Sequence, residues 1–156
     1  MIDETQVAVM EMAAKGYSCA QIVLLLGLRV MGRENPDLTR AMAGLAMGAG
    51  CGDICGALTG GLCLLSVHTA KGIDDERPSP MARTLMGALI KWFKFDELKG
   101  EVKPDCLRIF EKNGQTYDAS ANPTESCADL VINTWRKVMG LLSENQIDPT
   151  LGRDEA

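Results

Sequence analysis

One apolar stretch, positions 41–70, constrains the fold more than any other part of the sequence. The glycine-rich segment 48–52 and the acidic Asp53 divide this stretch, so neither half reaches the roughly 18 uninterrupted apolar residues of a transmembrane helix. A membrane hairpin would also bury Asp53 in lipid, which costs a few kcal/mol. We therefore expect a buried helix pair at the centre of a globular fold, and no membrane span.

Helical spacing of apolar residues dominates the remaining sequence, and no run alternates with period two. Helices are expected over about residues 4–15, 18–30, 37–48, 54–70 and 80–94, followed by a short helix opened by Pro104 and a last helix opened by Pro123. The sequence thus predicts an all-α, single-domain bundle of about six to seven helices with a buried, glycine-rich central helix. The domain is expected to span residues 1–145, with 146–156 as a polar C-terminal tail.

Charge and cysteine content limit the classes of function. The net charge is −5 and no basic patch is interleaved with aromatic residues, so nucleic acid is not an expected partner. The opening sequence MIDETQVAVM does not have the pattern of a signal peptide, which leads us to expect a cytoplasmic protein. In a reducing compartment, six cysteines indicate metal binding or redox chemistry rather than a disulfide framework.

The positions of the cysteines relative to the expected helix starts are the most informative feature. Four lie at or just after a helix start: Cys19, Cys55, Cys106 and Cys127. Helix N-termini carry unpaired N–H groups and a positive dipole end, so we expect lowered thiol pKa values there and more of the thiolate that binds metals. A scatter of inert, buried thiols is the alternative interpretation.

The pair Cys51-x-x-x-Cys55 is the only close pair, and its spacing is not the C-x-x-C of a thioredoxin-like site or a zinc ribbon. Gly50, Gly52 and Gly56 surround this pair and would let backbone N–H groups approach an anionic centre. Such groups donate to cluster sulfurs and tune their potential. We therefore expect these glycines to contact a cofactor, and Cys51 to be a fifth candidate ligand.

Two other reactive side chains have simpler interpretations. Cys63 lies two turns into the apolar helix, where a free cysteine usually serves as a small core residue. His68 is the only histidine, and we expect it in the core or at the helix end rather than in a catalytic Cys–His pair. The sequence therefore assigns no catalytic residue.

The cysteine pattern resembles a known family. Its segments here are Gly16-Tyr17-Ser18-Cys19-Ala20-Gln21, then Cys55-Gly56-Ala57-Leu58-Thr59-Gly60, then isolated cysteines at 106 and 127. In order and rough spacing they resemble the C-GCAxxG-C-C family of redox-active bacterial proteins from about residue 10 to 143. The resemblance implies a helical protein in which Cys19, Cys55, Cys106 and Cys127 are the functional set, with an iron–sulfur cluster as the prosthetic group. Cys51 is an addition to this pattern, and Cys63 lies outside it.

Three functions fit these observations. The first is an iron–sulfur protein with ligands Cys19, Cys51 or Cys55, Cys106 and Cys127, used for electron transfer or cofactor handling. The second is a metal-free thiol/disulfide protein, and the third is a structural zinc protein. Ligands dispersed over several helices favour a cluster over a compact zinc module, so we rank the cluster first. A redox partner protein is expected, and a homo-oligomer is compatible with the sequence.

Overall fold

The computed structural model describes residues 3–122 and 126–153. Within these residues the chain forms seven α-helices and no β-strand, which confirms the predicted all-α bundle. The helices are α1 (Glu4–Ala14), α2 (Cys19–Val30), α3 (Pro36–Met42), α4 (Gly56–Thr69), α5 (Ala82–Trp92), α6 (Cys106–Lys112) and α7 (Ala128–Glu144). Shorter helical turns are η1 (Ala43–Leu45), η2 (Gly48–Gly52) and η3 (Phe93–Glu97).

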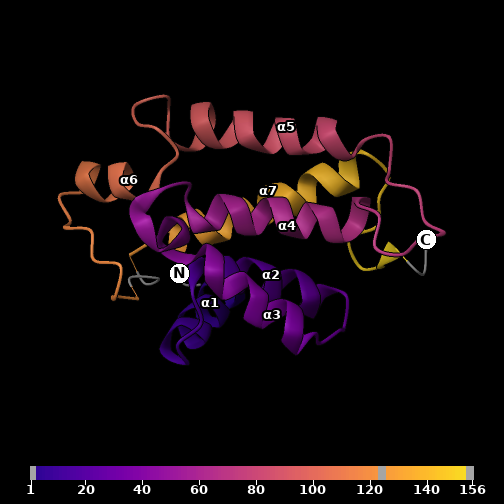
Figure 1. Cartoon of the computed structure of the whole chain (residues 1–156), viewed down its shortest axis with the longest axis horizontal. Coiled ribbons are helices and arrows are strands. Elements are labelled where there is room, and N and C mark those ends of the chain that lie inside the picture. The colour runs from indigo at the N-terminus through magenta and orange to yellow at the C-terminus, as the bar shows by residue number, and fades with distance from the viewer. Residues whose placement is uncertain (1–2, 123–125, 154–156) are drawn as a thin grey trace.

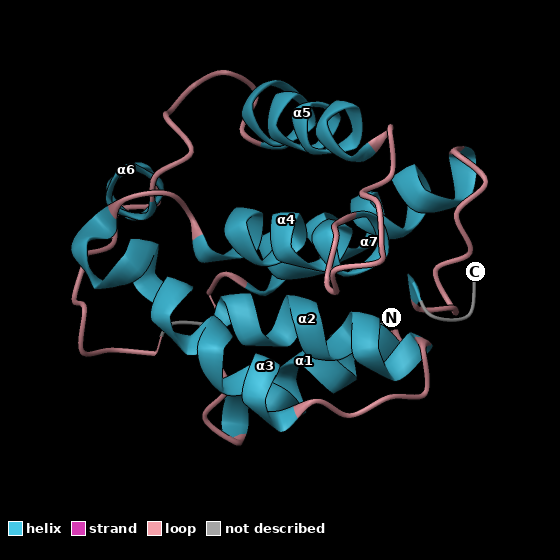
Figure 2. Ribbon diagram, turned by 45° about the vertical axis from the view of Figure 1, so that its right-hand side comes forward, coloured by secondary structure: helices cyan, strands magenta, loops and turns pink. Residues whose placement is uncertain are grey.

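The central element is α4, which has helices on several sides. In both views α5 lies on one side of α4, α1, α2 and α3 lie on the other, and α7 runs beside α4 (Figure 1, Figure 2). The short helix α6 lies at one end of the molecule, next to the turn that precedes α4 (Figure 2). Leu64 and Leu65 of α4 are fully buried, and each contributes roughly 1.5–3 kcal/mol of burial free energy.

Adjacent glycines of α4 allow this close packing. A Cβ on Gly60 would lie 2.9 Å from the Ala20 carbonyl oxygen and 3.0 Å from its Cα, so the backbone of α2 approaches α4 directly. A Cβ on Gly61 would lie 2.7 Å from Thr134 Cγ2 of α7 and 3.1 Å from Leu89 Cδ2 of α5. The predicted glycine-rich central helix is therefore present, and its glycines are what allow three neighbouring helices to approach it.

Local signals place the helix starts. At α2, the Gln21 Oε1 accepts from the Ser18 backbone N–H at 3.0 Å and from the Ser18 hydroxyl at 3.2 Å. At α6, the Asp105 carboxylate accepts the Arg108 backbone N–H at 2.8 Å. These side chains bond backbone or cap groups that have no partner within the helix.

The expected helix over residues 37–48 is wrong in its second half. The α-helix ends at Met42, and after η1 the chain makes a left-handed turn at 47–50. Met47 and Ala49 have φ of 56°, Gly48 has 62° and Gly50 has 72°, values that no right-handed helix contains. The predicted start of the last helix at Pro123 lies outside the described residues. Within the described residues, α7 begins at Ala128.

After α7 the chain turns back onto the body of the protein. The Ile147 N–H donates to the Leu142 carbonyl at 2.9 Å, and the Ile147 side chain packs against the core. Buried Gly152 contacts the guanidinium of Arg33. His68, near the end of α4, is only 3% exposed and belongs to the core. None of the helices among the described residues combines the length and apolarity needed to cross a bilayer.

Candidate functional site

Four of the six cysteines line one cavity of about 510 Å³, which we call the thiol cavity. Cys19 is the first residue of α2 and Cys106 is the first residue of α6. Cys55 and Cys127 are the N-caps of α4 and α7. The predicted helix-start placement of these four residues is therefore confirmed, and the bundle brings four helix N-termini to the same cavity.

Two backbone hydrogen bonds hold the segments that carry Cys55 and Cys106 side by side. The Cys55 N–H donates to the Pro104 carbonyl at 2.9 Å, and the Cys106 N–H donates to the Asp53 carbonyl at 2.7 Å. The two segments pair like a very short antiparallel bridge just before α4 and α6 begin. Because the bonds use the amides of the two cysteines themselves, the starts of these helices are fixed relative to each other.

Gly56 provides the space for the thiol of Cys19. A Cβ on Gly56 would lie 2.4 Å from the Cys19 Sγ and 3.1 Å from the Leu45 carbonyl oxygen. Gly50, another predicted cofactor contact, lines the cavity as Gly56 does. Gly52, the third, is not among the lining residues, and a Cβ there would lie 3.0 Å from the Leu107 Cβ, which is a packing contact with α6.

The left-handed turn forms one wall of the thiol cavity through Met47, Ala49 and Gly50. Gly48 is required in this turn, since a Cβ there would lie 2.4 Å from both the N and the O of Asp53. A left-handed conformation costs a non-glycine residue roughly 1–2 kcal/mol, so the turn at Met47 and Ala49 is strained. The strain persists because the Asp53 N–H bonds the Gly48 carbonyl at 3.1 Å and tertiary contacts hold Met47.

The loop around residues 117–122, which the sequence predicted only as irregular, also lines the thiol cavity. Ala119, Ala121 and Asn122 line the cavity, and the Tyr117 hydroxyl donates to the Met47 carbonyl at 2.7 Å. The Tyr117 ring packs edge-on against Phe110, with 6.1 Å between ring centroids. This loop, together with Met47, is the part of the site that sequence reasoning missed, because its role depends on contacts about 70 residues apart.

The thiol cavity is electrically neutral in its side chains. Among the lining residues that the structure describes, none carries a charge. Burial raises the pKa of all four cavity thiols, and neighbouring cysteines raise it further for three of them. The pKa of Cys106 rises to about 12 and that of Cys127 to about 11, mainly through burial and then through the charges of the other thiols.

The expectation that helix N-termini lower these pKa values is therefore wrong. Backbone N–H groups do act in the expected direction, those of Ala57 and Leu58 on Cys55 and that of Met47 on Cys19. Their effect is smaller than that of desolvation, which comes first for each thiol. Without a bound cation the four thiols are neutral at physiological pH, and the N–H donors remain available to a thiolate.

The family comparison agrees with this geometry. The model of the C_GCAxxG_C_C family, whose description reads "Putative redox-active protein", matches residues 17–141 and so contains all four cavity cysteines and the glycine block. This chain belongs to the C_GCAxxG_C_C family. Searches of the curated proteins and of the solved structures give no significant match.

In this C_GCAxxG_C_C protein the two additional cysteines lie elsewhere. Cys51 is exposed and does not line the cavity; its Sγ lies 3.3 Å from the Gly48 carbonyl oxygen and 3.3 Å from the Asp53 carboxylate. Cys63 is half-buried and packs against the hydrophobic core, as predicted. The structure thus groups the four family cysteines and separates Cys51 from them.

The donor set of this C_GCAxxG_C_C protein is made of soft sulfur ligands. Over residues 3–122 and 126–153, no three His, Cys, Asp or Glu side chains are close enough to hold a single metal ion. A cluster of several irons separates its thiolates further than one ion does. Four thiols around an uncharged cavity of this size, with backbone N–H groups directed at Cys19 and Cys55, fit such a group.

Proposed function

We propose that this redox-active family member holds an iron–sulfur cluster through Cys19, Cys55, Cys106 and Cys127. The observation that carries the proposal is that four thiols from four helix N-termini line one cavity without a charged side chain among its described lining residues. Thiolates are the ordinary ligands of both [2Fe–2S] and [4Fe–4S] clusters. When bound, the cluster would supply one-electron transfer.

The raised pKa values support ligation rather than free thiol chemistry. A thiol that attacks disulfides needs a substantial thiolate fraction near neutral pH. Burial raises the pKa of every cavity thiol, and no cationic side chain among the described lining residues counteracts it. Iron ions supply the positive charge that four buried thiolates require, and this favours the cluster over a metal-free dithiol.

The chain's own groups would position and tune such a cluster. The Met47 N–H faces the Cys19 sulfur, and the Ala57 and Leu58 N–H groups face Cys55. Hydrogen bonds to ligand sulfurs raise the potential of a cluster because they stabilise the added negative charge. The loop with Tyr117 lines the cavity through Ala119, Ala121 and Asn122, and we expect it to limit the access of solvent to the cluster. We infer that electrons pass to a partner redox protein in a reducing compartment.

Anaerobic purification followed by reconstitution with iron and sulfide tests the proposal. The expected result is a coloured protein with a broad visible absorbance and matched amounts of iron and acid-labile sulfide. A protein that stays colourless and metal-free after reconstitution would rule the cluster out. Zinc bound at a constant ratio per chain would instead support a structural zinc site.

A further inference from the structure

A second cavity, of about 720 Å³, has arginine side chains in its lining. Three arginines line it, Arg29 at the end of α2, Arg33 in the following loop and Arg40 on α3, and we call it the arginine cavity. Glu34 is the one carboxylate among the described lining residues. In a chain with a net charge of −5, this gathering of guanidinium groups indicates an anionic ligand.

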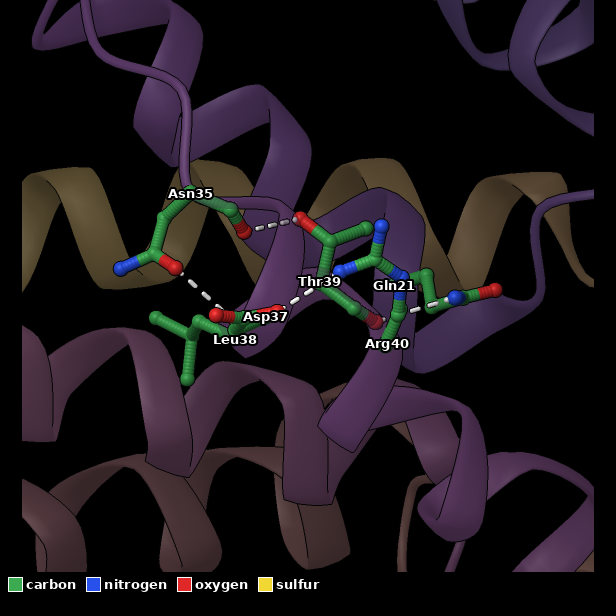
Figure 3. Close-up of polar contacts among 6 residues, drawn as sticks. All are labelled: Gln21, Asn35, Asp37, Leu38, Thr39 and Arg40. Atoms are coloured by element: carbon green, nitrogen blue, oxygen red, sulfur yellow. Dashed lines mark hydrogen bonds and ion pairs between the residues drawn. The ribbon is translucent and has the colours of Figure 1, made fainter.

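Arg40 forms an ion pair, and that pair is weak. Arg40 contacts the Asp37 carboxylate at 2.7 Å (Figure 3), but the two side chains are 74% and 97% exposed. Exposed pairs of this kind contribute little, about 0–1 kcal/mol, so a ligand can displace Asp37 at small cost. Guanidinium groups bind carboxylate and phosphate in a forked geometry with two parallel hydrogen bonds.

Part of the remaining lining is apolar. Met12 and Leu28 are buried, and Leu25 and Tyr17 are half-buried beside them. A cavity of several hundred cubic ångströms with an apolar surface and a few convergent polar groups is typical of small-molecule sites. An inorganic ion would leave this apolar surface unused, whereas an anion with an apolar body would cover it.

One side chain connects this cavity to the thiol cavity. Gln21 lines both cavities, and its Nε2 donates to the Thr39 carbonyl of α3 at 3.0 Å (Figure 3). Its Oε1 accepts from Ser18, the residue before Cys19. Gln21 thus links the start of α2, which carries a cavity thiol, to the helix that carries Arg40.

We propose that the arginine cavity binds a small organic anion, a carboxylate or phosphate on an apolar body, next to the thiol site. The anionic group contacts Arg29 and Arg40, and the apolar body covers the half-buried Tyr17 and Leu25. Binding at this cavity does not require a cluster, so the metal-free chain can be used to test it.

The probes are benzoate and phenyl phosphate, with benzyl alcohol as the neutral analogue and inorganic phosphate as the anion without an apolar body. Binding to the full, reduced, metal-free chain is followed by ¹H–¹⁵N NMR titration. We expect shifts concentrated at residues 17–40, and tighter binding of benzoate or phenyl phosphate than of either control. Which of the two binds more tightly identifies the preferred anionic group.

Arginine variants give the decisive comparison. Arg29→Gln and Arg40→Gln should each weaken binding about tenfold, the loss expected for one charged hydrogen-bonding partner. Arg83→Gln, on an exposed position of α5 outside the cavity, should leave binding unchanged. Arg33 is left in place because its guanidinium also packs against Gly152. The proposal is overturned if benzyl alcohol or inorganic phosphate binds as tightly as the organic anions, or if Arg83→Gln weakens binding as much as Arg29→Gln.

Discussion

The Cys19 thiol lies in the space that a side chain at Gly56 would fill: a Cβ on Gly56 would lie 2.4 Å from the Cys19 Sγ. The glycine of the Cys-Gly-Ala block therefore has a direct steric role at the site. It lets the first residue of α2 direct its thiol across the first turn of α4. The block thus contains one candidate ligand, Cys55, and a glycine, Gly56, that leaves room for the thiol of a second candidate ligand, Cys19.

Replacement of Gly56 by alanine should disturb both the fold and the site. The added methyl group must displace Cys19 or shift α4, which typically costs about 1–3 kcal/mol. Chemical unfolding of the reduced, metal-free protein measures this loss. Gly87→Ala in α5 is the matched control, because nothing lies within 4 Å of its Cβ position, and it should stabilise the protein by about 0.5–1 kcal/mol. Equal effects of the two substitutions would contradict the steric role of Gly56.

At Ala49, in the strained turn, the substitution of alanine by glycine should not destabilise the protein. Ala49 is exposed and has φ of 56°, so Ala49→Gly removes left-handed strain and should leave stability unchanged or raise it by up to about 1 kcal/mol. Ala8→Gly, at a buried position in the right-handed helix α1, should lower stability by about 1 kcal/mol. Thermal unfolding of the two variants compares them, and an Ala49→Gly variant as destabilised as Ala8→Gly would refute the strained turn.

Tyr117→Phe should loosen the loop whose residues Ala119, Ala121 and Asn122 line the thiol cavity. The substitution removes the hydrogen bond to the Met47 carbonyl and leaves the ring contact with Phe110, at a cost of about 0.5–1.5 kcal/mol. We expect faster alkylation of Cys106 and Cys127 in the metal-free protein, measured by mass spectrometry. Cys63, in contact with the core away from this loop, is the internal reference. Unchanged rates at both cavity thiols would show that the loop does not control access.

The raised thiol pKa values predict an alkaline loss of stability. Burial raises the pKa of Cys127 to about 11 and that of Cys106 to about 12 in the folded protein, whereas an exposed thiol in the unfolded chain has a pKa of about 8.5. The folded state therefore holds its protons more tightly. The stabilisation is complete below the unfolded pKa and is lost as pH rises toward the folded pKa values.

Urea unfolding of the reduced, metal-free protein between about pH 7 and 10 measures this effect. The free energy of unfolding should fall more steeply for the parent protein than for a Cys106→Ser, Cys127→Ser double variant. Parallel pH profiles for the two proteins would mean that the buried thiols are not the titrating groups.

Much of the fold follows from local signals in the sequence. Ser18 with Gln21 and Asp105 with Arg108 mark helix starts within four residues, so the placement of Cys19 and Cys106 was predictable. The left-handed turn was not predictable as a wall of the thiol cavity, because Tyr117, which bonds the Met47 carbonyl, is 70 residues away in the sequence. Local spacing suggests where a chain can turn, but not which distant side chain bonds to the turn.

The candidate site was predictable in its members and not in its electrostatics. Helix N-termini were present at all four cysteines, yet the sign of the thiol pKa shift depends on how deeply the bundle buries them. The burial of Cys51 was equally unpredictable: it is only four residues before Cys55, yet its side chain is exposed and does not line the thiol cavity. The arginine cavity joins α2 and α3 side chains to Met12 and Tyr17, which no sequence motif connects.

Iron content after anaerobic reconstitution of six single cysteine-to-serine variants tests the central claim most directly. Cys19→Ser, Cys55→Ser, Cys106→Ser and Cys127→Ser should each lose most of the visible absorbance and bound iron, because each removes one thiolate from the thiol cavity. Cys51→Ser and Cys63→Ser should retain both, since neither side chain lines that cavity. Loss of iron in the Cys51 variant with full retention in any one of the four cavity variants would contradict the account.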